Sequence, residues 1–259
     1  MSRKIIAGNW KMHMTHTDAV SFVKRLQEEL AKINTSYEVV VIPPFTSLFP
    51  VSTAIDKGIL KLGAQNVFYE REGAYTGEIS PVMLKALGCD YVIVGHSERR
   101  KYFAESDEMI AKKLKAVLIE GMTPILCVGE TLEQREKGRH KEVVESQLVS
   151  DLAYLSVDEI KRIVIAYEPV WAIGTGHNAT PEQAQEMHEF IRNILEEKFA
   201  ASDVPILYGG SVKPENIRDI SAMKDVDGAL VGGASIKVES FVGIILNAYQ
   251  GGELKCIHS

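Results

Sequence analysis

The chain has few cysteines and no long apolar segment. Its 259 residues include only three cysteines, Cys89, Cys127 and Cys256, which lie far apart in the sequence. An odd number at this spacing matches neither a metal site nor a disulfide framework, so we expect a reducing, cytoplasmic location. No run approaches the roughly 20 apolar residues that a membrane-spanning helix needs. The apolar stretch near the N-terminus is also far too short for a signal peptide, and we expect no membrane partner.

The chain also lacks a surplus of positive charge. Lysine and arginine number 29 against 35 aspartates and glutamates, which gives a formal net charge of −6. A nucleic-acid partner is therefore not expected, and any anionic ligand must be met by local positive groups. Neither low-complexity segments nor Pro/Gly/Ser-rich linkers interrupt the sequence. We expect residues 1–259 to form a single domain, with 251–259 as a C-terminal tail.

A repeated strand–helix unit accounts for most of the chain. Eight short β-rich runs occur, and most are continuously apolar, as in parallel strands that are buried on both faces. The segments between them are mostly too long for hairpins and have helical periodicity. The predicted strands are Ile5–Trp10, Glu38–Ile42, Leu60–Gln65, Tyr91–Val94, Thr123–Val128, Arg162–Tyr167, Val204–Tyr208 and Gly228–Val231.

Polar residues that start helices precede three of the intervening segments. One helix is predicted behind Thr17-Asp18, and another from Ser106, which two acids follow in the first turn. The clearest start is Thr180-Pro181-Glu182-Gln183, with a capping residue, a proline at the first helical position and a capping-box glutamine.

Eight strand–helix units in about 250 residues predict an α/β protein that forms a closed (β/α)8 barrel. The alternative is an open doubly wound sheet, which often carries a glycine-rich fingerprint after its first strand. Here that strand runs into Gly8-Asn9-Trp10-Lys11, without the G-x-G-x-x-G pattern. The sequence therefore favours the barrel.

The active site of such a barrel lies at the carboxyl ends of its strands. Polar side chains and glycines follow several of the predicted strands, so we expect them to converge on one mouth. Because no His/Cys cluster has metal-type spacing, we expect metal-free acid–base chemistry. The candidates are Asn9, Lys11, Gln65, Asn66, His96, Glu98, Glu130, Glu168, Ser211 and the glycine pairs Gly209-Gly210 and Gly232-Gly233.

The two glycine pairs follow the last two predicted strands. Glycine lets backbone N–H groups approach an oxyanion closely, and phosphate sites recur at this place in barrels. The alternative is that these glycines only make tight turns. Two pairs on adjacent strands favour a phosphate site.

Glu168 follows the sixth predicted strand directly and precedes an apolar segment bounded by Pro169 and Gly176. A segment of this kind resembles a hinged lid, and its closure would desolvate Glu168 and strengthen it as a base. The alternative is an exposed glutamate on an ordinary loop. The spacing alone leaves both interpretations open.

His96 lies at the junction of the fourth strand and a helix, where the helix dipole would keep the imidazole neutral. It could then donate a hydrogen bond to a carbonyl, although a lone histidine is usually structural. Lys11 could supply the local cation, or be a surface lysine. The other six histidines are expected to face solvent, and the run at 99–101 to be structural, pairing with acids such as Glu105.

Six segments together resemble the triosephosphate isomerase family. They occur in the family's order, and the resemblance spans residues 4–249. The segments are Ala7–Met12, Gly73–Glu78, Val94–Arg100, Tyr167–Gly176, Tyr208–Val212 and Gly228–Ser235.

This resemblance implies a cofactor-free enzyme that interconverts dihydroxyacetone phosphate and glyceraldehyde 3-phosphate through an enediolate. Glu168 would be the base, and neutral His96 would polarise the carbonyl. Lys11 would offset negative charge, Asn9 would add a hydrogen bond, and Glu98 would bind within this network to Lys11.

The resemblance also implies how the phosphate is held and covered. Backbone N–H groups of Gly174, Ser211, Gly232 and Gly233 would hold it. The lid would protect the enediolate from phosphate elimination. Its residues would be Pro169, Val170, Trp171, Ala172, Ile173, Gly174, Thr175 and Gly176.

A long loop, Asn66–Ile79, carries Phe68, Tyr69 and Tyr75, and its length alone predicts a functional surface loop. The resemblance implies that it docks into a second subunit, with Thr76 near Asn9 and Glu98 of the partner subunit. The expected assembly is a homodimer.

Two features depart from the family pattern. His177-Asn178 follows the lid where many members carry Lys-Thr, which puts the rate of lid closure in question. Residues 251–259 extend past the family's usual end and include a free thiol at Cys256. We expect a frayed extension, a regulatory or disulfide role for Cys256 being the alternative.

Two other functions are alternatives. A sugar-phosphate aldolase or lyase would usually need a metal or a lysine buried within a strand. The one lysine within a predicted strand is Lys61, and it lies near the start of that strand. A non-catalytic phosphate-binding barrel would be expected to lack Glu168 or His96, and both are present.

Overall fold

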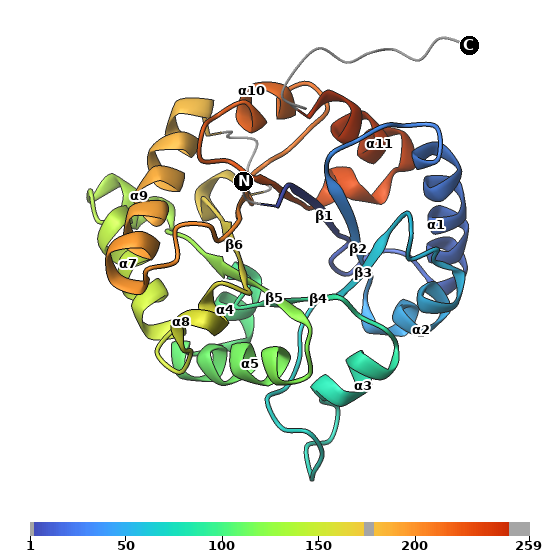
Figure 1. Ribbon diagram of the computed structural model, residues 1–259, viewed down its shortest axis with the longest axis horizontal. Coiled ribbons are helices and arrows are strands. Elements are labelled where there is room, and N and C mark those ends of the chain that lie inside the picture. Colours follow the sequence, from blue (N-terminus) through green and yellow to red (C-terminus); the bar gives the residue numbers. More distant parts are fainter. Residues whose placement is uncertain (1–2, 174–178, 249–259) are drawn as a thin grey trace.

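Eight parallel strands form a closed barrel in which each strand pairs with its neighbours in chain order and β8 pairs with β1. The computed structural model describes residues 3–173 and 179–248. Figure 1 shows the strands at the centre and the helices around them. The closed (β/α)8 barrel is confirmed, and each strand lies within its predicted run. The strands are β1 (Ile5–Asn9), β2 (Glu38–Ile42), β3 (Lys61–Ala64), β4 (Tyr91–Val94), β5 (Thr123–Val128), β6 (Val164–Tyr167), β7 (Ile206–Tyr208) and β8 (Gly228–Val231).

The helices of the outer layer connect successive strands. Two short 3-10 helices, η1 (Val170–Ala172) and η2 (Gly233–Ile236), follow β6 and β8 at the carboxyl end of the barrel. The α-helices are α1 (His16–Leu30), α2 (Phe45–Ala54), α3 (Pro81–Ala86), α4 (Ser97–Phe103), α5 (Asp107–Ile119), α6 (Leu132–Glu136), α7 (His140–Asp151), α8 (Val157–Ile160), α9 (Pro181–Phe199), α10 (Ile217–Ser221) and α11 (Val238–Asn247). Within the described residues, no helix is long and apolar enough to span a membrane.

The predicted helix starts at Ser106 and Thr180 are confirmed, since each side chain caps its helix. The start predicted behind residues 17–18 is wrong, because α1 begins at His16 and its cap is Thr15. Thr15 accepts a bond from the backbone N–H of Asp18, and the Asp18 carboxylate accepts one from the backbone N–H of Thr15. This reciprocal capping starts the helix earlier than the predicted position.

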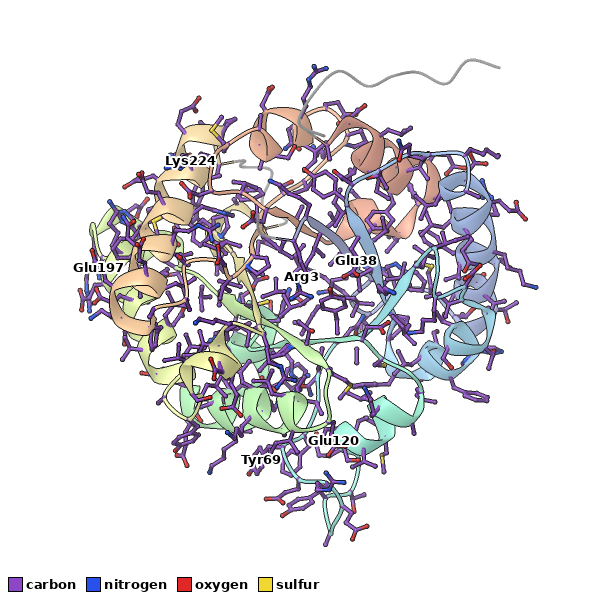
Figure 2. The ribbon with its side chains drawn as sticks, in the orientation of Figure 1. Arg3, Glu38, Tyr69, Glu120, Glu197 and Lys224 are labelled. Atoms are coloured by element: carbon purple, nitrogen blue, oxygen red, sulfur yellow. The ribbon has the colours of Figure 1, made fainter. Side chains whose placement is uncertain are left out.

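Buried apolar side chains form two layers. Alternate strand residues such as Ile5 and Ala7 belong to the cluster inside the barrel, whereas Ile6 belongs to the larger cluster under the helices. This burial on both faces explains why the strands read as continuously apolar. Figure 2 shows side chains filling the space between sheet and helices.

Polar side chains occupy the amino-terminal end of the barrel. Arg3 and Glu38 lie near its centre in Figure 2. The Tyr91 hydroxyl donates to the Glu38 carboxylate and accepts a long bond of 3.5 Å from Arg3 Nη1. A ligand cavity is therefore expected at the other end, where the strands finish.

The arginine run at the start of α4 is structural, as predicted. Arg99 Nε donates to Glu105 Oε1 at 2.5 Å. Arg100 bonds Asp107 of α5 and Asp151 of α7, both at 2.6 Å. These ion pairs connect α4 to α5 and α7 and so hold the segment that carries His96.

Cysteine and histidine side chains are among the buried groups. Cys89 and Cys127 are buried free thiols, in agreement with their apolar surroundings. The expectation of solvent exposure is wrong for His188, which is fully buried on α9 with Nδ1 3.2 Å from the Asp225 carbonyl oxygen. Burial lowers the pKa of His188 to about 4, so the ring is neutral at pH 7. Residues 174–178 and 249–259, which include part of the predicted lid, His177, Asn178 and Cys256, lie outside the described residues.

The closure between β1 and β8 requires a glycine. Gly228 has φ +143°, and a Cβ built on it would lie 1.8 Å from the Ile5 carbonyl oxygen. Any side chain there would separate the two strands that complete the barrel.

The substitution Gly228→Ala is therefore expected to lower the free energy of unfolding by about 3 kcal/mol or more, measured by urea denaturation. Gly138→Ala is the control, because Gly138 also has a positive φ, +68°, but no atom lies within 4 Å of its built Cβ. Its expected cost is about 1 kcal/mol, from backbone strain alone. Equal losses in the two variants would contradict the close contact between β1 and β8.

Candidate active site

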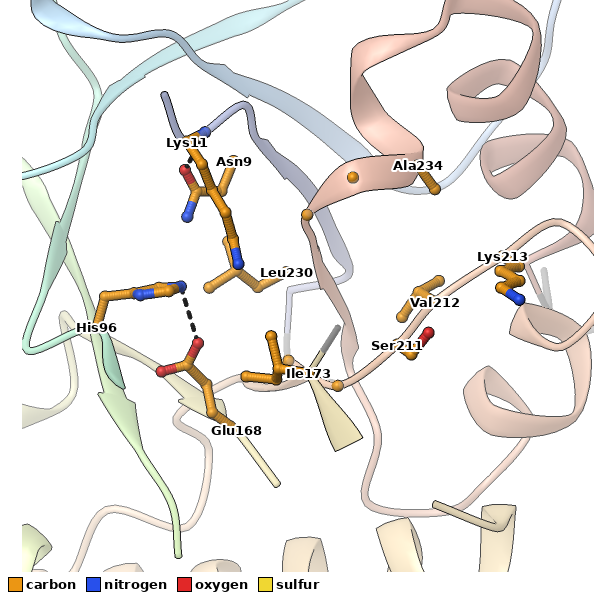
Figure 3. A pocket seen from close by; sticks show the side chains of 14 residues that line it. Asn9, Lys11, His96, Glu168, Ile173, Ser211, Val212, Lys213, Leu230 and Ala234 are labelled. Carbon is orange, nitrogen blue, oxygen red and sulfur yellow. Dashed lines mark hydrogen bonds and ion pairs between the residues drawn. The ribbon is translucent and has the colours of Figure 1, made fainter. Parts of the chain in front are cut away.

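A cavity of about 330 Å³ opens at the carboxyl end of the barrel. Figure 3 shows it from close by. Most of the described residues that the sequence analysis selected come together in its wall, although their strands are far apart in the chain. The predicted residues that line it are Asn9, Lys11, His96, Glu168, Ile173, Gly209, Gly210, Ser211, Gly232 and Gly233.

Glu168 follows β6 and is almost fully buried, with 2% of its surface exposed. Its Oε2 accepts a 2.8 Å bond from the backbone N–H of Ser97, and its Oε1 lies 3.0 Å from His96 Nε2. Burial raises the pKa of Glu168, but His96 and the Ser97 amide together lower it by more. The pKa therefore lies below its ordinary value. The side chain is thus a buried carboxylate at neutral pH, and not an exposed glutamate on an ordinary loop.

Two glycines make room for Glu168. A Cβ on Gly129 would lie 1.7 Å from the Glu168 carbonyl oxygen, and one on Gly209 would lie 3.0 Å from Glu168 Cγ. The sequence analysis missed Gly129, whose signal is a glycine directly after a strand that neighbours β6. Its lack of a side chain lets the ends of β5 and β6 approach closely.

His96 caps the start of α4, and its Nδ1 accepts a 3.2 Å bond from the backbone N–H of Glu98. A ring that accepts at Nδ1 carries its proton on Nε2, which then donates to Glu168. Burial lowers the pKa of His96, but the Glu168 carboxylate raises it more, so the net shift is upward. The helix terminus alone predicted the opposite direction. The backbone N–H that donates to Nδ1 favours the neutral imidazole, whereas the Glu168 carboxylate opposes it.

Lys11 has a left-handed backbone, with φ 51°, which is uncommon for lysine. Its N–H donates to Asn9 Oδ1 at 3.0 Å, and its carbonyl accepts a 2.8 Å bond from Gln65 Nε2. Its Nζ lies 2.7 Å from Glu98 Oε1. The expected contact between Lys11 and Glu98 is present, although Glu98 itself does not line the cavity.

The glycine-bearing loops after β7 and β8 form the wall on the other side of the cavity from His96 (Figure 3). A Cβ on Gly232 would lie 3.4 Å from Lys11 Cε, so the absence of a side chain keeps the lysine close to this backbone. The sequence analysis did not select four of the lining residues. They are Val212, Lys213, Leu230 and Ala234.

The first part of the predicted lid, Pro169–Ile173, is described. Within it Trp171 Nε1 donates to Glu130 Oε1 at 2.8 Å, and the Val170 N–H donates to the Glu130 carbonyl at 3.1 Å. Glu130 also accepts a bond from the Tyr167 hydroxyl. Glu130 does not line the cavity; it anchors the segment that follows Glu168. Asn66 and Gln65, also at strand ends, are not among the lining residues.

The described part of the chain contains no cluster of the metal-binding type. No group of three or more His, Cys, Asp or Glu side chains there is placed to hold a metal ion. The site described above consists of one buried carboxylate, one imidazole, one ammonium, one amide and glycine-rich backbone.

Comparisons with known proteins agree with this arrangement. The family model described as triosephosphate isomerase matches residues 4–248. A triosephosphate isomerase of Carboxydothermus hydrogenoformans is 53% identical over 248 residues, covering 95% of this chain and 98% of the relative. Those of Dictyoglomus turgidum and Caldanaerobacter subterraneus are 52% and 54% identical, each covering 95% of this chain and 99% of the relative. The chain belongs to the triosephosphate isomerase family.

Proposed function

We propose that the cavity interconverts dihydroxyacetone phosphate and D-glyceraldehyde 3-phosphate, with Glu168 as the base. As a member of this family the chain is an isomerase of glycolysis and gluconeogenesis. The observation that carries the assignment of Glu168 is its buried carboxylate, which lies beside His96 in the same cavity as Lys11. Such a carboxylate can take a proton from carbon without first losing bulk water.

The reaction moves one proton between adjacent carbons. Glu168 removes a proton from the carbon next to the carbonyl, and the C–H electron pair forms the C=C bond of the enediolate. The carbonyl π pair moves to oxygen, which His96 stabilises by donating from Nε2. Glu168 then returns the proton to the neighbouring carbon, while His96 moves protons between the two oxygens.

Two neighbouring side chains support this charge movement. The Lys11 ammonium offsets negative charge on the enediolate and phosphate, and the Asn9 amide, which lines the same wall, donates to the oxygens. Glu98 holds Lys11 through the 2.7 Å contact. In the described geometry both Glu168 oxygens are engaged by Ser97 and His96, so substrate binding must replace these contacts.

The phosphate is assigned to the backbone of the loops after β7 and β8, at Ser211, Gly232 and Gly233. Support comes from their place in the cavity wall and from the small size of the two glycines. Gly174 is proposed as a fourth donor by resemblance and lies outside the described residues. The lid, Pro169–Gly176, would close over this phosphate and exclude water from Glu168.

Two alternative functions are less well supported. Lys61 lies at the start of β3, the end of the barrel opposite the cavity, and its Nζ donates to the Lys57 carbonyl. It is therefore badly placed for a Schiff base with a ligand in the cavity. A non-catalytic phosphate-binding barrel does not explain a buried Glu168 beside His96.

A coupled assay with either triose phosphate tests the function directly. We expect isomerisation in both directions, with the same rate in the presence of EDTA, because every proposed step uses protein side chains. Absence of activity would contradict the function, and activity lost with EDTA would contradict the metal-free mechanism.

The base is tested by Glu168→Ala and Glu168→Gln. Both are expected to lower kcat by ~10²–10⁴ with little change in KM, because the base acts in the transition state. Glu168→Gln can still accept the bond from Ser97, so it separates loss of the base from loss of packing. Circular dichroism would verify folding, and an unchanged kcat in either variant would remove Glu168 as the base.

We further propose that the chain is a homodimer. Large apolar side chains are exposed in segments that follow β1, β2, β3 and β4, at the end of the barrel where the cavity opens. The loop at 66–79 projects from this part of the molecule, at the bottom of Figure 1. Phe68 packs on Tyr69 and Tyr75 within it, with ring centroids 4.3 and 4.6 Å apart. The exposed side chains are Met12, Phe49, Tyr75, Val82, Met83, Tyr102 and Phe103.

These side chains would be covered by a second copy of the chain. Thr76, within this loop, is proposed to approach Asn9 and Glu98 of the partner subunit. We also propose that the chain is one domain, to which 251–259 adds a tail, and that it is cytoplasmic. The match over residues 4–248 and the two buried free thiols support these proposals.

Shortening the segment 70–77 is expected to give monomers in analytical ultracentrifugation, because it removes Tyr75 and Thr76. Tyr75→Ser should weaken the dimer, whereas Tyr154→Ser should not, although Tyr154 is about as exposed as Tyr75, 50% against 44%. A dimer that persists after the shortening would contradict the role of the loop.

A further inference from the structure

The substrate of the proposed reaction carries a phosphate dianion, whereas the protein has a net charge of −6. The global field of the protein therefore opposes entry of the substrate. Within the cavity, Lys11 is paired with Glu98, and Glu168 adds a negative charge. A further local cation is needed to make the mouth attractive to a dianion.

Lys213 is such a cation. It lines the cavity on the loop after β7, and its side chain is exposed. It forms no ion pair with any acid in the described part of the chain, so its charge is not compensated there. In Figure 3 Lys213 lies on the Ser211 side, away from Glu168 and His96. In the proposed binding mode its charge therefore lies nearer to the phosphate than to the reacting carbons.

The backbone that carries Lys213 is firmly held. The Asn216 side chain accepts a 2.8 Å bond from the Lys213 N–H and donates a 3.0 Å bond to the Ser211 carbonyl. The next residue, Pro214, accepts a 2.8 Å bond from Asn247 Nδ2 of α11. These bonds fix the position of Lys213 next to Ser211, a proposed phosphate donor.

We propose that Lys213 attracts the phosphate dianion into the cavity and so raises the rate of substrate association. This inference rests on the proposed function, because it takes a phosphorylated substrate as the ligand. Lys213 is not a catalytic residue; its long-range attraction acts before the chemical step. Its effect must therefore appear in kcat/KM, depend on salt and leave kcat unchanged.

The test measures kcat/KM for glyceraldehyde 3-phosphate at ionic strengths of about 0.01 M and about 1 M, where the Debye lengths are ~30 Å and ~3 Å. At low salt we expect Lys213→Gln to lower kcat/KM about threefold and Lys213→Glu about tenfold. Lys213→Arg should behave like the wild type. At high salt the differences should disappear.

Lys224→Gln is the matched control. It removes the same charge from an exposed lysine that precedes β8, and so lies toward the opposite end of the barrel, at the rim in Figure 2. We expect its kcat/KM to equal that of the wild type. An equal loss in Lys224→Gln and Lys213→Gln, a loss that persists at high salt, or a lowered kcat in Lys213→Gln would overturn the proposal.

Titration calorimetry with inorganic phosphate gives a second readout that does not depend on turnover. The Kd at low salt should rise about threefold in Lys213→Gln and remain unchanged in Lys224→Gln. Equal phosphate affinity in the wild type and Lys213→Gln would also overturn the proposal. A wild type that binds phosphate but does not isomerise would instead contradict the proposed function, and the two failures are therefore distinguishable.

Discussion

The burial of the Glu168 carboxylate is the constraint on which the rest of the site depends. A charge removed from water is costly unless hydrogen-bond donors replace the solvent. Here the Ser97 amide and His96 Nε2 supply those donors, and both lie where β4 joins α4. Gly129 and Gly209 allow the neighbouring strand ends to approach Glu168 without steric overlap. The position of one carboxylate thus depends on the ends of β4, β5, β6 and β7.

Lys11 is likewise held in place by its neighbours, and its backbone conformation is unusual. Its left-handed conformation costs about 1–2 kcal/mol relative to the ordinary helical region. Bonds to Asn9 and Gln65 hold it, and the ion pair with Glu98 orients the ammonium. Strain of this kind is common at sites where a side chain must point in one direction. At Lys11 it places the cation beside the backbone of Gly232.

The elements around the mouth serve different purposes, although they share one end of the barrel. Glu130 holds Trp171 and so anchors the start of the proposed lid on the β6 side. Exposed apolar side chains in the segments that follow β1 to β4 form the surface that we propose a second subunit covers. The loops after β7 and β8, with Lys213 among their lining residues, form another part of the cavity wall and are the proposed phosphate site. The proposed lid, the proposed phosphate site and the proposed dimer surface therefore involve different elements at this end of the barrel.

The periodicity of the sequence predicted parallel strands joined by crossover helices, because strands buried on both faces must be apolar throughout and long gaps require such helices. The count of eight units, without a G-x-G-x-x-G pattern, favoured the barrel over an open sheet. The predicted strands also indicated that Asn9, Lys11, His96 and Glu168 would lie at the same end of the barrel, since each ends or follows a strand. All four line the cavity there. The first helix began earlier than predicted because Thr15 and Asp18 cap it reciprocally. Several polar residues lie close together there, and the sequence alone does not show which of them is the cap.

Only the tertiary structure decided which of the strand-end residues reach the cavity. Glu130 and Glu168 both lie just after a strand and look equivalent in the sequence, yet Glu130 bonds Trp171 and Tyr167 while Glu168 enters the cavity. Likewise, nothing in the local sequence separates Lys213 from other exposed lysines. The role that we propose for it, attraction of the phosphate, depends on its place in the cavity wall next to Ser211. Local pattern determines the secondary structure and its faces, whereas burial, pairing and pKa depend on neighbours that are distant in the chain and meet only when the barrel closes.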